Sequence, residues 1–245
     1  MKPGIYTLMA ASEENHWWFT ARRAIVEKII TQLNLPPGAK ILEAGCGTGG
    51  NLSMLGKYGQ VHAMELDEQA RQIANAKGIA QIVYGRLPDE VPYQPEQFDL
   101  IVLLDVLEHV EDDCGSLEAL KKLLKPEGHL LLTVPAFPSL WSEHDVAHYH
   151  KRRYRLNDLK NKVGNAGLEV TYASYFNTLL FPLIFAARQL GNLFQRKTES
   201  GDLAMPHPLL NRLLYAVFSC ERLVLGRWQL PFGVSAILLA QKGNS

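Results

Sequence analysis

The chain has 245 residues, which is enough for one large domain with a substantial hydrophobic core. Lysine and arginine together number 25, as do aspartate and glutamate, so the formal net charge is zero. A neutral chain has no overall attraction for a polyanion, which argues against nucleic acid as its main partner. The three cysteines have no metal-ligand or disulfide spacing, and the N-terminus has no secretory pattern, so we expect a cytoplasmic protein.

The first half of the chain predicts alternating helices and strands. We expect a helix over residues 12–33, with Ser12 as its N-cap and a Pro-Pro pair closing it. Residues 98–105, FDLIVLLD, are almost wholly apolar, as expected for a parallel strand covered on both faces. The remaining expected elements are strands at 40–45, 61–66 and 81–85 and helices at 51–59 and 67–78.

The second half continues this alternation and then breaks it. It predicts helices at 111–125 and 156–167, with strands at 128–136, 168–176 and 232–242. This order predicts an α/β fold with a mainly parallel sheet. We expect a single domain over residues 1–245, with an N-terminal helix or lid at 12–35, a core at 38–176 and 231–243, and a helical, net basic insertion at 177–230.

A glycine-rich segment, ILEAGCGTGGN at residues 41–51, fits two cofactor fingerprints. GCGTGG contains the G-x-G-x-x-G of dinucleotide-binding folds, and Glu43 before it completes the acidic-x-G-x-G-x-G loop of S-adenosylmethionine enzymes. A strand, a glycine turn and a helix N-terminus together place backbone N–H groups against a ligand. Glu65, at the end of the next strand, is placed to bind ribose hydroxyls of either cofactor.

Three features favour the methyl donor. Glu43 suits an ammonium and a sulfonium better than a pyrophosphate. The second feature is that FDLIVLLDVLEHVEDD is followed downstream by LLKPEGHLLLTVP. The third is that the last strand comes directly after the insertion. At these residues the sequence resembles the class I S-adenosylmethionine-dependent methyltransferases, over residues 38–170 and the final strand. The resemblance implies a Rossmann-like, doubly wound sheet of seven strands, with the last one antiparallel and beside the fifth, and S-adenosylhomocysteine as a product.

The resemblance also implies which residues contact the donor, all in the loops that follow the first four strands. Arg86 stands where many relatives carry an aspartate that accepts from adenine, so a backbone carbonyl or water must accept here. Cys46 is expected to be a small residue facing the loop. The implied contacts are Glu43, Gly45, Cys46, Gly47 and Gly49 for the methionine end, Glu65 and Leu66 for the ribose, Gly85, Arg86 and Leu87 for adenine, and Asp105 and Val106 along the donor.

The segment LWSEHDVAHYHKRRY, residues 140–154, follows the fifth strand and faces the expected ligand side of the sheet. An alcohol acceptor must lose its proton, which a histidine can take near neutral pH. We predict His144 as this base, oriented by Asp145, with His148 as the second candidate and His109 as the third. The same side chains could instead bind backbone groups and hold the loop in place.

Other roles for these residues remain open. Arg153, with the two basic residues before it, could bind an acceptor phosphate or could belong to a solvated charged run. Trp18 could form a lid over the substrates or could pack on the sheet. A metal site made of His144, Asp145, His148 and His150 is the weaker hypothesis, and we predict no metal.

The aromatic first helix and the W-S-x-H-D-x-x-x-H-x-x-R-Y stretch resemble a branch of the family, type 11-like, that is found with cell-envelope sugar and lipid enzymes. Residues 177–230 are expected to cap the acceptor pocket, with contact to a membrane interface or a dimer surface as alternatives. The oligomeric state is not predicted.

The sequence therefore predicts an S-adenosylmethionine-dependent methyltransferase. We expect a small, amphipathic or lipid-linked acceptor methylated at oxygen, because no N/D-P-P-Y motif follows the fourth strand. One alternative is an NAD-dependent oxidoreductase. The other is a non-catalytic module that binds S-adenosylmethionine and serves as a scaffold or interaction partner.

Overall fold

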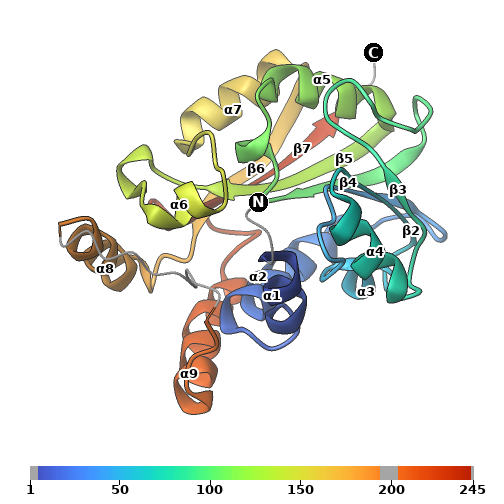
Figure 1. The fold of residues 1–245 in the computed structure, drawn as a ribbon. Helices are drawn as coiled ribbons and strands as arrows, with labels where there is room; N and C mark the ends of the chain where they lie inside the picture. The colour runs from blue at the N-terminus through green and yellow to red at the C-terminus, as the bar shows by residue number, and fades with distance from the viewer. Residues whose placement is uncertain (1–4, 194–203, 244–245) are drawn as a thin grey trace.

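A computed structural model of the chain describes residues 5–193 and 204–243 and shows one seven-stranded sheet with helices on both faces (Figure 1). The strand order is β3-β2-β1-β4-β5-β7-β6, and β7 runs antiparallel to both of its neighbours. This confirms the predicted Rossmann-like sheet with its antiparallel last strand. The strands are β1 (Lys40–Ala44), β2 (Gln60–Glu65), β3 (Ile82–Tyr84), β4 (Phe98–Leu104), β5 (Leu124–Pro135), β6 (Leu168–Phe176) and β7 (Ser235–Lys242).

The helices divide between the two faces of this sheet. α5 and α7 cover one face, α2 and α9 cover the other, and α3 and α4 pack beside β2 and β3 (Figure 1). The helices are α1 (Ile5–Ser12), α2 (Trp17–Ile30), α3 (Leu52–Leu55), α4 (Glu68–Ala76), α5 (Asp113–Leu123), α6 (Glu143–Ala147), α7 (Leu156–Asn165), α8 (Phe181–Leu193) and α9 (Pro208–Ser219), with 3₁₀ turns η1 (Leu107–His109), η2 (Pro138–Leu140) and η4 (Cys220–Leu223).

The core forms on both sides of the central strand β4. Ile101 belongs to the cluster that contains Leu120 of α5, whereas Val102 belongs to the cluster that contains Ile25 of α2. All four side chains are fully buried. Successive residues of a strand point to opposite faces, so a strand covered on both sides must be apolar at every position. This explains why β4 is apolar at every position except Asp99, which is half-buried and pairs with Lys125.

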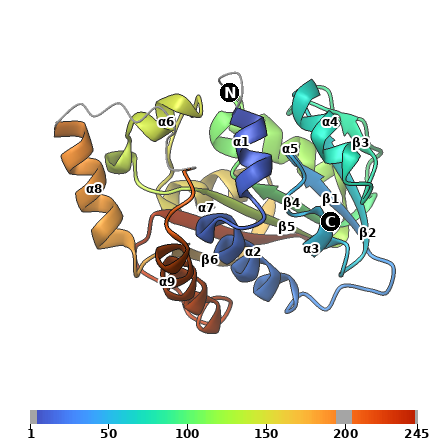
Figure 2. The ribbon, with the colours of Figure 1, turned by 60° about the horizontal axis from the view of Figure 1, so that its bottom comes forward.

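The N-terminal segment differs from the prediction of one helix beginning at Ser12. Ser12 ends α1, where its hydroxyl donates to the carbonyl of Leu8 at 2.8 Å. α2 begins at Trp17, and Nδ1 of His16 accepts from the backbone N–H of Trp18 at 3.3 Å as the N-cap. The prediction of a single helix is therefore wrong, because a turn at residues 13–16 separates two helices. Figure 2 shows α1 and α2 as two separate helices, with α1 standing at the upper edge of the sheet near α4.

The two described helices of the long insertion, α8 and α9, contact different parts of the protein. α9 packs along α2 (Figure 2). Asn211 of α9 accepts from the N–H of Trp17 at 2.9 Å and donates to the carbonyl of Asn15 at 2.8 Å. α8 contacts the η2 turn, and residues 194–203 lie outside the described residues. The predicted helix at 51–59 is also shorter than expected, because α3 ends at Leu55 before Gly56.

Candidate active site

A cavity of about 1460 Å³ opens at the edge of the sheet where the parallel strands end. The glycine loop, residues 45–50, and the residues that follow β2, β3 and β4 line one part of it. The 140–154 segment and η1 line another part, and side chains of α1 and α2 complete the wall. Most of the expected donor residues and acceptor residues therefore line one space; Glu43, Gly49 and Asp145 are absent from its described wall.

The glycine loop needs its glycines for two different reasons. The N–H groups of Gly45 and Cys46 both donate to the carbonyl of Met64, at 2.9 and 3.1 Å, which holds the loop against the end of β2. Gly45 has a φ of +77°, and a Cβ there would lie 2.7 Å from Cγ2 of Val106. Gly47 has open space where a Cβ would be, so only its φ of +53° favours glycine.

Glu65 ties the glycine loop to the start of α4. Its Oε2 accepts from the N–H of Gly47 at 2.9 Å, and its Oε1 accepts from the N–H of Asp67 at 3.0 Å. Glu65 and the half-exposed Leu66 line the cavity beside the loop. This position agrees with the predicted ribose site, although contact with the donor is still a proposal.

Glu43 lies behind the glycine loop rather than on the cavity wall. Among the described residues, the wall includes Asn51 but neither Glu43 nor Gly49. Asn51 donates from Nδ2 to Oε1 of Glu43 at 2.7 Å, and Oε2 of Glu43 has no hydrogen-bond partner in the described part of the chain. Burial raises the pKa of Glu43 to about 7, against the opposing effect of the Asn51 hydrogen bond. Sequence analysis missed Asn51. Its position directly before α3 is the feature of the sequence that could have indicated it.

The expected adenine residues also reach the cavity. Gly85, Arg86 and Leu87 line it after β3. Arg86 exchanges two backbone hydrogen bonds of 2.8 Å with Glu90, and its guanidinium forms an ion pair with the same residue. The Arg86 guanidinium is therefore paired with Glu90 at the cavity wall.

Glu13 connects the turn between α1 and α2 to the glycine loop. It is buried and lines the cavity, and its Oε2 accepts from the hydroxyl of Thr48 at 2.7 Å. Its Oε1 pairs with Lys77, at the end of α4. Tyr6 and Met9 of α1 line the same wall. Sequence analysis missed this contribution because it assigned residues 12–15 to the start of a helix.

Arg22 of α2 reaches across the cavity to Asp105, the residue after β4, and forms an ion pair with it. The carbon at the centre of its guanidinium lies 4.7 Å from the ring centre of Trp18. Trp18, Arg22, Asp105 and Val106 all line the cavity. Trp18 was predicted to contact the substrates, and it lies on the cavity wall. It also packs against the hydrophobic cluster that contains Ile25 of α2.

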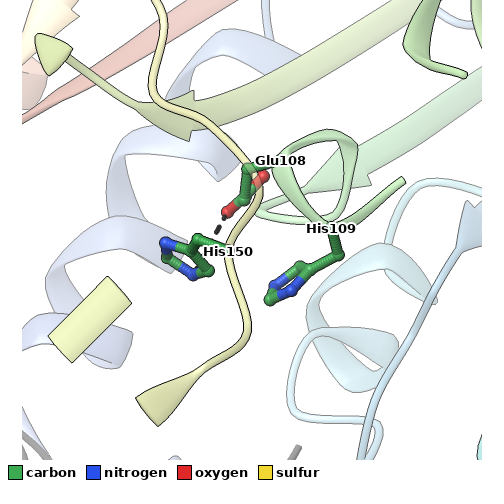
Figure 3. Close-up of side chains that lie close together, drawn as sticks. All are labelled: Glu108, His109 and His150. Carbon is green, nitrogen blue, oxygen red and sulfur yellow. Dashed lines mark ion pairs between the residues drawn. The ribbon is translucent and has the colours of Figure 1, made fainter. Parts of the chain in front are cut away.

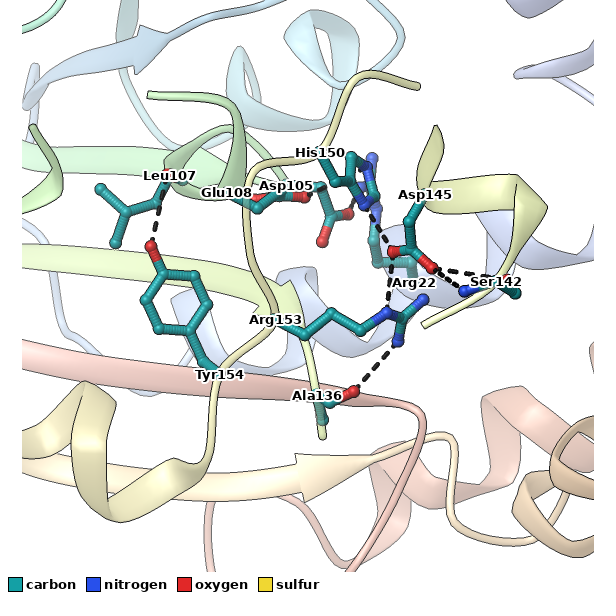
Figure 4. A network of polar contacts seen from close by, with 10 residues as sticks. All are labelled: Arg22, Asp105, Leu107, Glu108, Ala136, Ser142, Asp145, His150, Arg153 and Tyr154. Atoms are coloured by element: carbon teal, nitrogen blue, oxygen red, sulfur yellow. Dashed lines mark hydrogen bonds and ion pairs between the residues drawn. The ribbon is translucent and has the colours of Figure 1, made fainter. Parts of the chain in front are cut away.

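The carboxylate of Asp145 organises the 140–154 segment (Figure 4). One oxygen accepts from the N–H of Ser142 at 2.9 Å, closing the first turn of α6. The other oxygen lies 2.8 Å from Nδ1 of His150 and 2.7 Å from Nε of Arg153. The prediction that Asp145 orients His144 therefore needs correction, because its hydrogen bonds position His150. Burial alone would raise the pKa of Asp145, but His150 and Arg153 outweigh it and hold the pKa below its usual range.

The basic residues at 151–153 form contacts within the protein. Arg153 is buried and also donates from Nη1 to the carbonyl of Ala136 at 3.0 Å, so it fixes the segment to the end of β5 (Figure 4). Lys151 pairs with Glu111, and Arg152 pairs with Asp113 at 3.0 Å. These contacts disfavour the predicted role of Arg153 in binding an acceptor phosphate.

Four histidines gather at this part of the cavity. The ring centres of His144 and His148 are 4.4 Å apart, and those of His109 and His150 are 4.7 Å apart. Burial, followed by the charges of His148 and Arg188, lowers the pKa of His144 well below its usual value. Burial and the neighbouring histidines lower the pKa of His109 to about 3. Both rings are therefore neutral at pH 7.

Glu108 of η1 is the buried acid of this cluster. Its Oε1 lies 4.0 Å from Nε2 of His150, and in the described part of the chain neither of its carboxylate oxygens has a hydrogen-bond partner. Ligand atoms of Glu108, His109 and His150 all lie within 4.8 Å of one another (Figure 3). Burial, followed by the charge of Asp105, raises the pKa of Glu108 well above its usual value. This set differs from the metal ligands considered in the sequence analysis, which missed Glu108.

Comparison with known proteins identifies the family. Residues 17–196 match the family of methyltransferase domains. The chain is 30% identical over 142 residues to phosphoethanolamine N-methyltransferase 1 of Zea mays, an alignment that covers 55% of this chain and 28% of that protein. It is 30% identical over 138 residues to the ubiquinone biosynthesis O-methyltransferase of Xanthomonas euvesicatoria pv. vesicatoria (strain 85-10), covering 50% of this chain and 57% of that protein. The alignments thus span less than two thirds of either relative.

A solved structure shows the same fold. Geranyl diphosphate C-methyltransferase from Streptomyces coelicolor A3(2), in complex with Mg²⁺, geranyl-S-thiolodiphosphate and S-adenosylhomocysteine, superposes with a TM-score of 0.62 and 12% identity. The match covers 91% of this chain and 76% of that one.

The chain belongs to the family of methyltransferase domains. Its class is that of the S-adenosylmethionine-dependent methyltransferases with a Rossmann-like fold, and S-adenosylmethionine is the cofactor of the class. This membership decides between the two fingerprints of the glycine loop in favour of the methyl donor and against NAD. Among the described helices, none is long and apolar enough to cross a membrane.

Proposed function

We propose that this protein transfers a methyl group from S-adenosylmethionine to a hydroxyl oxygen of a small or amphipathic acceptor. The observation that carries this proposal is the single cavity of about 1460 Å³ that joins the glycine loop to the four histidines. Two substrates held in one enclosed space can reach the in-line geometry that methyl transfer requires. In this proposal the donor lies along the glycine loop, with its ribose at Glu65 and its adenine beside Gly85.

The reaction forms a bond between the methyl carbon and the acceptor oxygen and breaks the bond between that carbon and sulfur. The sulfonium becomes the neutral thioether of S-adenosylhomocysteine, and the hydroxyl proton must leave the acceptor. We assign this proton to the His144–His148 pair. His148 is the preferred acceptor, because burial lowers the pKa of His144 well below its usual value. Asp145 supports the site by holding the segment that carries both rings.

The preference for oxygen rests on these histidines and on the residues after β4. The matched relatives are named for both nitrogen and oxygen methylation. In this chain the sequence after β4 is DVLEH rather than an amide-holding N/D-P-P-Y motif. A neutral imidazole beside the cavity can remove a hydroxyl proton, whereas a neutral amine acceptor attacks without losing a proton first.

An amphipathic or lipid-linked acceptor is supported by the surface around α8 and α9. Ile184 and Ala187 of α8 line the cavity. In the described residues after 177, the exposed charges include Arg212, Arg222 and Arg227, whereas Glu221 is buried and accepts from backbone N–H groups. The exposed apolar side chains of this surface include Leu179, Leu183, Phe185, Leu209, Leu210, Leu213, Leu223, Trp228 and Phe232. A basic and apolar surface of this kind suits an anionic membrane interface.

The first test is calorimetric titration of the full chain with S-adenosylhomocysteine and, separately, with NADH. We expect micromolar, one-to-one binding of S-adenosylhomocysteine and no binding of NADH. Transfer of labelled methyl groups should then favour phenolic and lipid-linked alcohols over their amine analogues. NADH binding without S-adenosylhomocysteine binding would overturn the proposed reaction, and transfer to the amines alone would overturn the oxygen preference.

A further inference from the structure

Glu108 is an acidic residue of the η1 turn that lies beside the cavity. The Glu108 side chain is fully buried. Within the described part of the chain, neither oxygen of its carboxylate has a hydrogen-bond partner. Buried polar groups in folded proteins almost always have partners, because an unsatisfied one destabilises the folded state and an unpaired charge destabilises it more. A ligand that Glu108 is built to bind would remove this cost.

Two imidazole rings stand next to this carboxylate (Figure 3). Nε2 of His150 lies 4.0 Å from Oε1 of Glu108, and one ligand atom from each of Glu108, His109 and His150 falls within 4.8 Å of the other two. All three residues line the cavity. The cluster thus has two nitrogens and one carboxylate oxygen that converge beside the proposed acceptor site.

The tautomer of His150 is set by Asp145. The Oδ1 atom of Asp145 lies 2.8 Å from Nδ1 of His150, and a carboxylate at that distance accepts the hydrogen of Nδ1. Nε2 then carries a lone pair and faces Glu108. Asp145 is itself held by Nε of Arg153 at 2.7 Å (Figure 4). A carboxylate that orients a histidine through its far nitrogen is the arrangement that commonly supports a metal ligand.

We propose that Glu108, His109 and His150 bind a divalent transition-metal ion such as Zn²⁺. Two histidines and one carboxylate form a donor set of catalytic zinc sites, which leave a further coordination position open. Ligands bonded at about 2.1 Å in a tetrahedron lie about 3.4 Å apart, so the cluster needs only a small contraction from its present spacing.

The open position of this ion faces the cavity in which we place the acceptor, and its role rests on the proposed function. An acceptor hydroxyl bound there would lose its proton more easily, because a metal ion stabilises the alkoxide. The proton would pass to His148, and the oxygen would attack the methyl carbon. The ion would thus position the acceptor, while the protein supplies its ligands and the proton acceptor.

The test uses the full chain after treatment with a chelator. Co²⁺ is added while the visible absorption of the bound ion is followed, and Zn²⁺ binding is measured by calorimetry. We expect one equivalent of either metal to bind. Glu108→Gln and His150→Gln should each weaken binding by at least about 100-fold, and Asp145→Asn by about 10–100-fold. His129→Gln is the matched control, because His129 lies in β5 and is absent from the described cavity wall.

Each variant is also checked by circular dichroism and by titration with S-adenosylhomocysteine, and His109→Gln replaces any variant that does not fold. The proposal is overturned if the wild-type chain binds no Co²⁺, or if Glu108→Gln binds it as tightly as the wild type does. These titrations need no methyl acceptor. Metal binding without methyl transfer would therefore overturn the proposed function alone. Methyl transfer by a metal-free chain would overturn the ion's role in the reaction, and the titrations alone decide whether the site exists.

Discussion

Arg22 and Asp105 form an ion pair that joins α2 to the carboxyl end of β4. The Arg22 side chain is 8% exposed and that of Asp105 is 19% exposed, so water screens the pair only weakly. Asp105 also has a φ of +55°, a conformation that aspartate tolerates better than most residues. The pair therefore ties α2 to the residue that follows β4, beside the cavity.

Removing one partner of this pair should destabilise the fold. We expect Arg22→Met to lower the free energy of unfolding by about 2 kcal/mol, because Asp105 keeps its charge without its partner. The double variant Arg22→Met/Asp105→Asn should recover part of this loss. Urea unfolding of the wild type, both single variants and the double variant measures the coupling. A coupling energy below about 0.5 kcal/mol would show that the pair does not hold the helices.

Gly45 and Gly78 make a matched test of the glycine loop. Both have positive φ, +77° and +68°, but a Cβ would strike Val106 at Gly45 and would meet nothing within 4 Å at Gly78. Gly45→Ala should therefore destabilise the protein by about 1–3 kcal/mol through the clash and should weaken S-adenosylhomocysteine binding. Gly78→Ala should cost about 1 kcal/mol of backbone strain and leave binding unchanged. Equal binding by the two variants in calorimetry would contradict this assignment.

We expect Glu13 to contribute to the affinity for the donor, although it lies outside the glycine loop. Glu13→Gln removes the charge that pairs with Lys77 and weakens the bond to Thr48. We expect the affinity for S-adenosylhomocysteine to fall about tenfold, or about 1.4 kcal/mol. Glu14→Gln is the control for the charge near Lys77, because the exposed Glu14 carboxylate lies 3.9 Å from the same Nζ atom. If both variants bind like the wild type, the turn between α1 and α2 does not shape the donor site.

The buried acid Glu43 predicts a specific pH dependence. Its pKa rises from 4.5 to about 7 on folding, mainly through burial. Between these values the folded state holds a proton that the unfolded state has lost, so the free energy of unfolding should fall as the pH rises from about 4.5 to 7. Glu43→Gln should reduce this fall by about 2–3 kcal/mol. Urea unfolding at about pH 5 and pH 8 measures it, with the exposed Glu118→Gln as control. An unchanged slope in Glu43→Gln would show that Glu43 does not titrate in this range.

The apolar surface of α9 predicts binding to anionic vesicles. Leu209 and Leu213 are 70% and 60% exposed, and Arg212 lies between them in sequence. We expect the wild-type chain to sediment with anionic vesicles, less so with neutral ones, and less at high salt. The double variant Leu209→Ser/Leu213→Ser should lose most of this binding. Ile79→Ser, at an exposed site near β3, should keep it. Equal sedimentation of the two variants would exclude α9 as the contact.

The sequence by itself determined the features that depend on neighbouring residues. A strand, a glycine turn and a helix start within residues 40–55, so the donor loop was visible from its spacing. The apolar run of β4 predicted a strand buried on both faces, because every side chain of such a strand meets another apolar layer. The order of strands and helices, together with the family resemblance, was then sufficient for the class of protein.

Only the tertiary structure decided the features that depend on residues far apart in the chain. Asp145 meets His150 and Arg153 rather than orienting His144, because the segment folds back after α6 and is pinned to β5 by Arg153. In the sequence, Glu108 cannot be distinguished from any other acid beside a helix. In the folded protein, the same segment buries it beside two histidines. Local spacing limits which residues can meet along an element, but burial and charge pairing between elements decide which of them do.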